Sequence, residues 1–176
     1  MTGENRHPQS SSQAGAPGRI SLRALIEPDR LRRIVTPSGE GVRGFYPSLK
    51  AGRMVEYESR GERNTAALLD EIDVVLTFRE QPRRELWWDG QKVRRYTPDV
   101  EVVTVLGPVL VEVKTARDAR RPKLRRKHAL IRASLASRGL AFIVWTERHV
   151  SRPARARAHL LAAAGRGMRL REGASA

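Results

Sequence analysis

The chain has 176 residues, enough for one domain with a hydrophobic core, and its 34 Lys and Arg against 19 Asp and Glu give a net charge of +15. The absence of cysteine excludes disulfides, thiolate metal sites and a cysteine nucleophile, and the 4 scattered histidines disfavour a histidine-based metal centre. Any metal should therefore bind to carboxylates, and a polyanion such as nucleic acid is the expected partner. Because no apolar run reaches the length of a membrane span and no signal peptide is recognisable, we expect a cytoplasmic protein without a membrane partner.

The two ends of the chain differ in composition from its middle. Residues 1–18 are rich in Ser, Gln, Gly and Pro, which predicts a disordered tail. Residues 19–57 are predicted to form a basic segment and a loop that packs on the core. The core domain itself is predicted over residues 58–165, and residues 166–176 are predicted to be a C-terminal tail.

The first predicted elements are a helix and three strands. Ser59 is a good N-cap residue and Glu62 stands three positions later, as in a capping box, so a helix is predicted over residues 59–70. Residues 74–78 predict a strand, and a hairpin is predicted over residues 85–96 around an Asp-Gly turn, as the start of an antiparallel meander. Its two adjacent tryptophans should face opposite ways, one in the core and the other partly exposed.

The second half of the domain predicts the centre of a sheet and its covering helices. Residues 99–105 and 109–114 read as two central strands joined at Gly107-Pro108. A basic helix is predicted over residues 118–137 with Gly139 as its stop, followed by a buried strand at 140–146 and a helix over about residues 151–164. This order predicts an α/β domain with a mixed sheet flanked by helices.

The residues suited to chemistry lie on the two central strands. Asp99 begins the first strand, and Glu112 and Lys114 stand at i and i+2 on one face of the second. Asp99, Glu112 and the carbonyl of Val113 would bind Mg²⁺ or Mn²⁺, with Glu62 completing the set, while Lys114 positions or deprotonates a water that attacks a phosphodiester. The alternative is that Glu112 and Lys114 form a charge pair on a solvated strand.

Five segments, in order, resemble the catalytic domain of the TnsA-type transposon endonucleases: residues 41–62, 78–82, 94–100, 110–114 and 146–147. The resemblance implies a restriction-endonuclease-like PD-(D/E)xK fold, dependence on Mg²⁺ or Mn²⁺, and cleavage of the 5′ ends of a mobile element beside a DDE-type transposase subunit. The family's functional residues fall on Glu62, Asp99, Glu112 and Lys114.

Three further positions bear on the resemblance. Gln81 also matches a family position, but we interpret it as making a hydrogen bond within the sheet. Gly61 stands where the family has a larger apolar residue. The chain also lacks room for the C-terminal domain that contacts the family's regulatory ATPase, which leaves that partner open.

The predicted basic helix provides the expected contact with double-stranded DNA. Its side chains would bind phosphates without reading bases, although a solvated helix face is the alternative. The predicted DNA-binding residues are Arg120, Arg121, Lys123, Arg125, Arg126 and Lys127.

Two other functions compete with the transposon endonuclease. The first is a stand-alone phage or repair nuclease of the same fold, which differs only in partners and substrate. The second is a non-catalytic DNA-binding or assembly module, against which stands the complete set of four charged residues.

Overall fold

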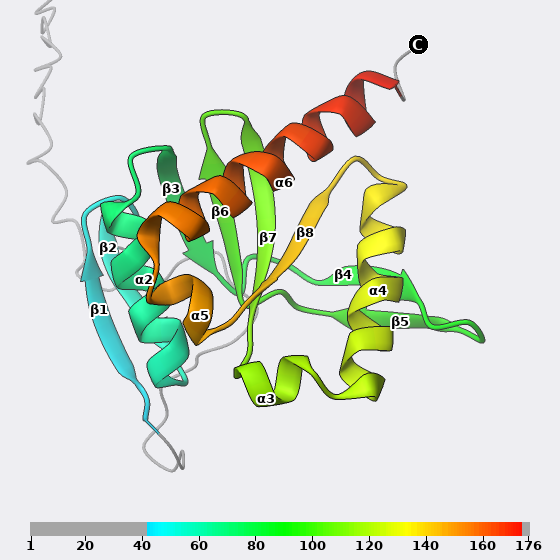
Figure 1. The fold of residues 1–176 in the computed structure, drawn as a ribbon, viewed down its shortest axis with the longest axis horizontal. Helices are drawn as coiled ribbons and strands as arrows, with labels where there is room; N and C mark the ends of the chain where they lie inside the picture. Colours follow the sequence, from blue (N-terminus) through cyan, green and yellow to red (C-terminus); the bar gives the residue numbers. More distant parts are fainter. Residues whose placement is uncertain (1–41, 174–176) are drawn as a thin grey trace, which may run out of the picture.

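The computed structural model describes residues 42–173, so the predicted tail at 1–18 and residues 19–41 of the basic segment lie outside the described residues. The described chain is a mixed α/β structure with one mixed sheet, two antiparallel hairpins and flanking helices (Figure 1). In chain order the elements are β1 (Gly44–Ser48), β2 (Arg53–Tyr57), α2 (Arg60–Glu71), β3 (Val75–Glu80), β4 (Glu85–Trp88), β5 (Val93–Tyr96), β6 (Val100–Thr104), β7 (Gly107–Val113), α3 (Ala116–Ala119), α4 (Pro122–Ala136), β8 (Ala141–Trp145), α5 (Glu147–Val150) and α6 (Pro153–Gly173).

The central sheet has the strand order β3-β6-β7-β8, with β8 parallel to β7 and the other pairs antiparallel. Alternation along β7 gives it two buried faces. Val109 and Val111 pack on one face with residues of α2 and α6, whereas Leu110 packs on the other with residues of α4 and the β4–β5 hairpin. Figure 1 shows α6 crossing the front of this sheet. In the same view α4 lies to the right of β8, on the side away from β7. The predicted central position of β6 and β7 is confirmed.

The β4–β5 hairpin is present where the sequence predicts it, but the predicted meander is wrong. The two strands form a separate two-stranded sheet, and β3 pairs instead with β6. The reason lies in what each strand buries: Trp87 of β4 packs with α4 in the second core cluster, whereas Phe78 of β3 joins the main core. Trp87 is buried and Trp88 exposed, as predicted. The turn between β6 and β7 falls at residues 105–106, two residues before the predicted Gly107-Pro108.

The single basic helix predicted over residues 118–137 is divided into α3 and α4. The break comes at Arg121, whose backbone is extended with a ψ of 125°. Pro122 follows it, and a proline disfavours the helical conformation in the residue before it while fitting the first position of a new helix. The division therefore has a local cause that the sequence already contains.

The last helix is longer than predicted, and residues 166–173 are not a tail. α6 continues to Gly173 because its end packs on β8 and on the turn before it. A Cβ at Gly167 would lie 3.2 Å from the Cβ of Ala141, so the glycine permits close contact between helix and strand. Arg171 Nη1 then donates to the carbonyl of Gly139 at 2.9 Å. These long-range contacts outweigh the low helix propensity of the glycines.

Helix α2 begins as predicted. Ser59 is its N-cap, and its hydroxyl accepts a hydrogen bond from the backbone N–H of Glu62 at 3.1 Å. The described part of the N-terminal segment forms the antiparallel β1–β2 pair, which contacts α2. None of the helices in residues 42–173 is both long and apolar enough to cross a membrane.

Candidate active site

Asp99 and Glu112 face each other at one end of the β6–β7 pair. The register pairs Val100 with Val111 and Glu101 with Leu110, so one further step sets Asp99 opposite Glu112. The backbone around Asp99 is fixed by a hydrogen bond from the N–H of Gln81 to its carbonyl at 2.9 Å. Gln81 has a φ of 40°, rare for a residue other than glycine. This bond is made by the backbone of Gln81, so the hydrogen bond expected of its side chain stays a prediction.

Lys114 joins the two carboxylates. Its ammonium nitrogen lies 2.7 Å from Glu112 Oε1, 3.0 Å from the carbonyl oxygen of Val113 and 3.4 Å from Asp99 Oδ2. These oxygens belong to three of the four residues that the sequence predicts as metal ligands, and in this structure all three lie around the ammonium group of Lys114. In residues 42–173 no three or more His, Asp or Glu side chains are arranged to hold a metal ion by themselves.

The charges of this cluster are strongly coupled. Burial, and next the charge of Glu112, raise the pKa of Asp99 to about 7, against the opposing effects of Lys114 and the N–H of Val113. Burial by itself lowers the pKa of Lys114, but Asp99 and Glu112 outweigh it and the pKa is raised. The lysine therefore stays protonated and provides the positive charge of the cluster.

Glu62 stands beside this cluster, on the first turn of α2. Its Oε2 accepts from the N–H of Glu58 at 2.8 Å and its Oε1 from the hydroxyl of Ser59 at 3.2 Å, so the carboxylate caps its own helix. Burial raises the pKa of Glu62, the hydrogen bonds from Glu58 and Ser59 oppose the rise, and Lys114 also lowers it. Three of the predicted site residues are thus in direct contact, and the fourth is their electrostatic neighbour.

Gly61 explains how α2 comes so near the sheet. A Cβ at this position would lie 3.3 Å from Val113 Cγ1, tighter than ordinary van der Waals contact. The glycine that departs from the family pattern therefore brings the first turn of α2, and Glu62 with it, against the end of β7.

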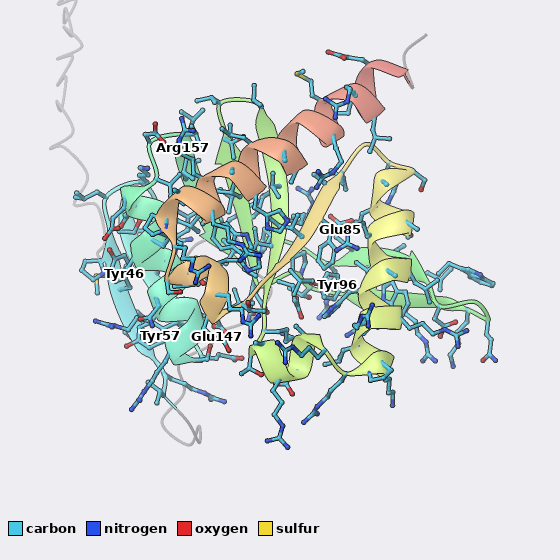
Figure 2. All side chains as sticks on the ribbon, in the orientation of Figure 1. Tyr46, Tyr57, Glu85, Tyr96, Glu147 and Arg157 are labelled. Carbon is cyan, nitrogen blue, oxygen red and sulfur yellow. The ribbon has the colours of Figure 1, made fainter. Side chains whose placement is uncertain are left out.

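A cleft of about 910 Å³ opens at this end of the sheet. Glu62, Val113 and Lys114 line it together with Glu147. Figure 2 labels Glu147 at the start of α5. Both carboxylate oxygens of Glu147 accept from the N–H of Ala116, at 3.1 and 2.9 Å, which ties α5 to the start of α3. A substrate in this cleft would therefore meet Lys114.

The sequence analysis missed Tyr96, which ends β5. Its hydroxyl donates to Glu112 Oε2, leaving Oε1 of the same carboxylate for Lys114. Figure 2 shows Tyr96 between the central sheet and α4, where its ring packs edge-on against Phe142 and beneath Lys127 Nζ. His128 Nε2 lies 3.9 Å from Glu112 Oε1, and burial lowers the pKa of this histidine. The available signal was a tyrosine three residues before Asp99, at the end of a predicted strand.

The predicted DNA-binding residues lie on and between α3 and α4. Lys127 is half-buried over the ring of Tyr96, at 5.6 Å from its centroid, and the other five are exposed. A second cleft, of about 660 Å³, is lined by Arg125, Arg126 and Arg132 and by no carboxylate. The first cleft is different, because four acidic side chains line it: Glu62, Glu71, Asp118 and Glu147.

Comparison of the chain with models of known protein families and with curated proteins finds no match.

Proposed function

We propose that this protein is a metal-dependent endodeoxyribonuclease with a PD-(D/E)xK-type active site on a restriction-endonuclease-like fold. The observation that carries the proposal is the convergence of Asp99 Oδ2, Glu112 Oε1 and the Val113 carbonyl on one cationic group. These three oxygens are buried or half-buried and lie beside a cleft that also contains Glu62. A simple charge pair on a solvated strand would not need this arrangement.

The chemistry of these donors fits Mg²⁺ or Mn²⁺. All are hard oxygens, and the two carboxylates lie close enough together to share one cation. A divalent ion bound there would polarise the scissile phosphate and make a water molecule more acidic. Glu62 could join the other ligands after leaving its capping hydrogen bonds.

Each residue then has a defined task. Asp99, Glu112 and the Val113 carbonyl hold the cation, and Tyr96 orients Glu112 through its hydrogen bond. Lys114 lines the cleft, where its ammonium would bind a phosphate oxygen and orient the attacking water.

Double-stranded DNA is the substrate that the surface charge supports. The exposed arginines of α3 and α4 and the arginine-lined second cleft lie on the chain directly after the predicted catalytic lysine. α4 also has no acidic residue in its first turn and no side-chain N-cap bond, which leaves its N-terminus suited to a phosphate. These groups would bind the backbone and position the duplex.

The resemblance supports a particular biological role, cleavage of the 5′ ends of a mobile element together with a DDE-type transposase subunit, and it leaves a regulatory ATPase open as a partner. The same residues would equally serve a stand-alone phage or repair nuclease. Reconstitution with a DDE-type transposase distinguishes these roles, since cleavage at element ends should then depend on both proteins.

The position of Lys114 favours a second candidate function, a non-catalytic DNA-binding module. Because its ammonium already satisfies the three oxygens, the cluster could be a purely structural ion pair. Such a module would bind DNA but neither Mg²⁺ nor Mn²⁺.

The deciding experiment combines titration calorimetry of Mn²⁺ and Mg²⁺ with nicking of supercoiled plasmid. We expect Asp99→Asn to abolish both metal binding and nicking, and Lys114→Ala to abolish nicking alone. Asp73→Asn is the matched control, because Asp73 is exposed and pairs with Arg157 at 2.8 Å, away from the site. Nicking that survives in both active-site variants would refute the nuclease; DNA binding without any metal binding would establish the module.

A further inference from the structure

The outer face of the β4–β5 hairpin exposes a cluster of apolar side chains. The register pairs Leu86 with Arg95 and Trp88 with Val93, so these four side chains share one face, opposite the one that Trp87 buries. Leu86 is 53% exposed, Trp88 52% and Val93 60%. Three large apolar side chains side by side in solvent indicate a contact surface rather than scattered exposure.

The hairpin is anchored at its base and projects at its tip. Arg138, after α4, donates to Glu85 Oε2 and to the carbonyl of Leu86, both at 2.9 Å, and Trp87 packs with residues of α4. Figure 1 shows the two strands running past α4 and ending in the turn beyond it. These contacts therefore fix the position of the exposed face without a bound partner.

The charges around this face indicate which kind of partner can bind to it. Residues 83–95 contain five Lys or Arg and two carboxylates. Both carboxylates are ion-paired: Glu85 with Arg83 and Arg138, and Asp89 with Arg94. Among residues 42–173, three exposed cations of the hairpin have no ion-pair partner, namely Arg84, Lys92 and Arg95.

A second copy of the chain fits this face poorly, because a symmetric contact would bring the same three cations together. A partner that offers both negative charge and apolar or aromatic surface fits well. Duplex DNA does so in its grooves, and the major groove, about 12 Å wide, admits a two-stranded β-ribbon.

We propose that the β4–β5 hairpin is a DNA-binding arm that enters a groove of the duplex beside the cleavage site. Leu86, Trp88 and Val93 contact base edges and sugars, while the three unpaired cations contact the flanking phosphates. The inference rests on the proposed function in taking DNA as the polyanion. It adds a contact that α3 and α4 do not supply, and β5 leads from it to Tyr96 and so to Glu112.

The test compares two double variants of the full-length protein in EDTA, by fluorescence anisotropy with a fluorescein-labelled duplex. Leu86→Ser with Val93→Ser removes two apolar side chains from the arm. The matched control is Val105→Ser with Leu106→Ser, which are 56% and 38% exposed at the β6–β7 turn. We expect the arm variant to lose about tenfold in affinity, consistent with the loss of one to two base contacts, and the control to bind as the wild type does. Unchanged thermal unfolding verifies that both variants are folded.

Trp88 provides a second readout on the unmodified protein. Trp87 and Trp145 are buried, so quenching by acrylamide reports mainly on Trp88. Duplex DNA should protect its fluorescence from the quencher, and polyglutamate should not.

The outcomes separate this inference from the proposed function. A wild type that does not bind duplex at all would overturn both. A wild type that binds, with equal affinities in the arm and control variants, would overturn the arm alone. Protection of Trp88 by polyglutamate but not by duplex would show that the face binds an acidic protein, and would likewise overturn the arm.

Discussion

At the scale of single residues, the candidate site depends on how one carboxylate is held. Glu112 uses Oε2 to accept from Tyr96 and Oε1 to contact Lys114, so both of its oxygens have fixed directions. A carboxylate that is held in this way binds a cation without first losing side-chain freedom.

Replacing Tyr96 by Phe keeps the aromatic ring and removes only the hydroxyl that donates to Glu112. We expect the affinity for Mn²⁺ to fall by about tenfold or more, as for other groups that orient a metal ligand, with little change in stability. Titration calorimetry gives the affinity. The matched control is Tyr57→Phe on β2, which should leave it unchanged; an affinity in Tyr96→Phe equal to that of the control would show that the hydroxyl does not position Glu112.

Asp99, Glu112 and Lys114 could be found from the sequence because strand alternation and one hairpin suffice to bring them together. Tyr96 could not, since its contact depends on where a separate hairpin packs. Nor could the sequence show that Lys114 itself would occupy the predicted ligand oxygens, because i and i+2 spacing fixes a shared face and says nothing of the rotamer.

At the scale of elements, the outcome of a prediction depended on whether the element is fixed by neighbouring residues or by residues far away in the sequence. α2 was predictable because its cap is local, and so was the break before α4, where Pro122 signalled it. The pairing of β3 with β6 and the last turns of α6 were not, since both depend on contacts between residues far apart in the sequence. The end of α6 is fixed by packing against Gly139.

The contact between the end of α6 and Gly139 gives a prediction about stability. Gly139 has a φ of 69°, and a Cβ there would lie 2.5 Å from Arg171 Cγ; Gly52 has a φ of 65° with nothing within 4 Å. Gly139→Ala and Gly52→Ala should both cost about 1–2 kcal/mol of unfolding free energy for the backbone strain. Gly139→Ala should cost more, because Arg171 must move. Urea unfolding measures both, and equal losses would mean that the end of α6 contributes nothing.

At the scale of the whole molecule, positive charge dominates, and it affects two half-buried histidines as well as the surface. Burial, and next the charges of His149, Arg166, Arg132 and Arg155, lower the pKa of His159 to about 4. His159 stacks on His149 with ring centroids 5.0 Å apart. Protonating this pair would add charge to a region that is already cationic.

The protein should therefore lose stability in mild acid. His159 titrates near 6.5 when unfolded and about 4 when folded, so between these values only the unfolded state gains the proton. Unfolding free energy should fall as pH drops through this window, by less than the ~1.4 kcal/mol per pH unit of a fully buried group, since the ring is partly exposed. His159→Gln should flatten the profile measured by urea unfolding at pH 7, 6, 5 and 4.5; an unchanged slope would assign the effect to other groups.

The ammonium of Lys114 also bears on how the protein reaches its folded state. Two carboxylates buried side by side would repel each other and oppose folding, but here their counter-ion is the side chain of Lys114, two residues after Glu112 in the chain. Folding is thus independent of the supply of divalent ions, unlike that of small domains whose cores form only around a metal. A chelator should therefore leave the metal-free protein folded, and any rise in melting temperature on adding Mn²⁺ would report binding of the ion to a protein that is already folded.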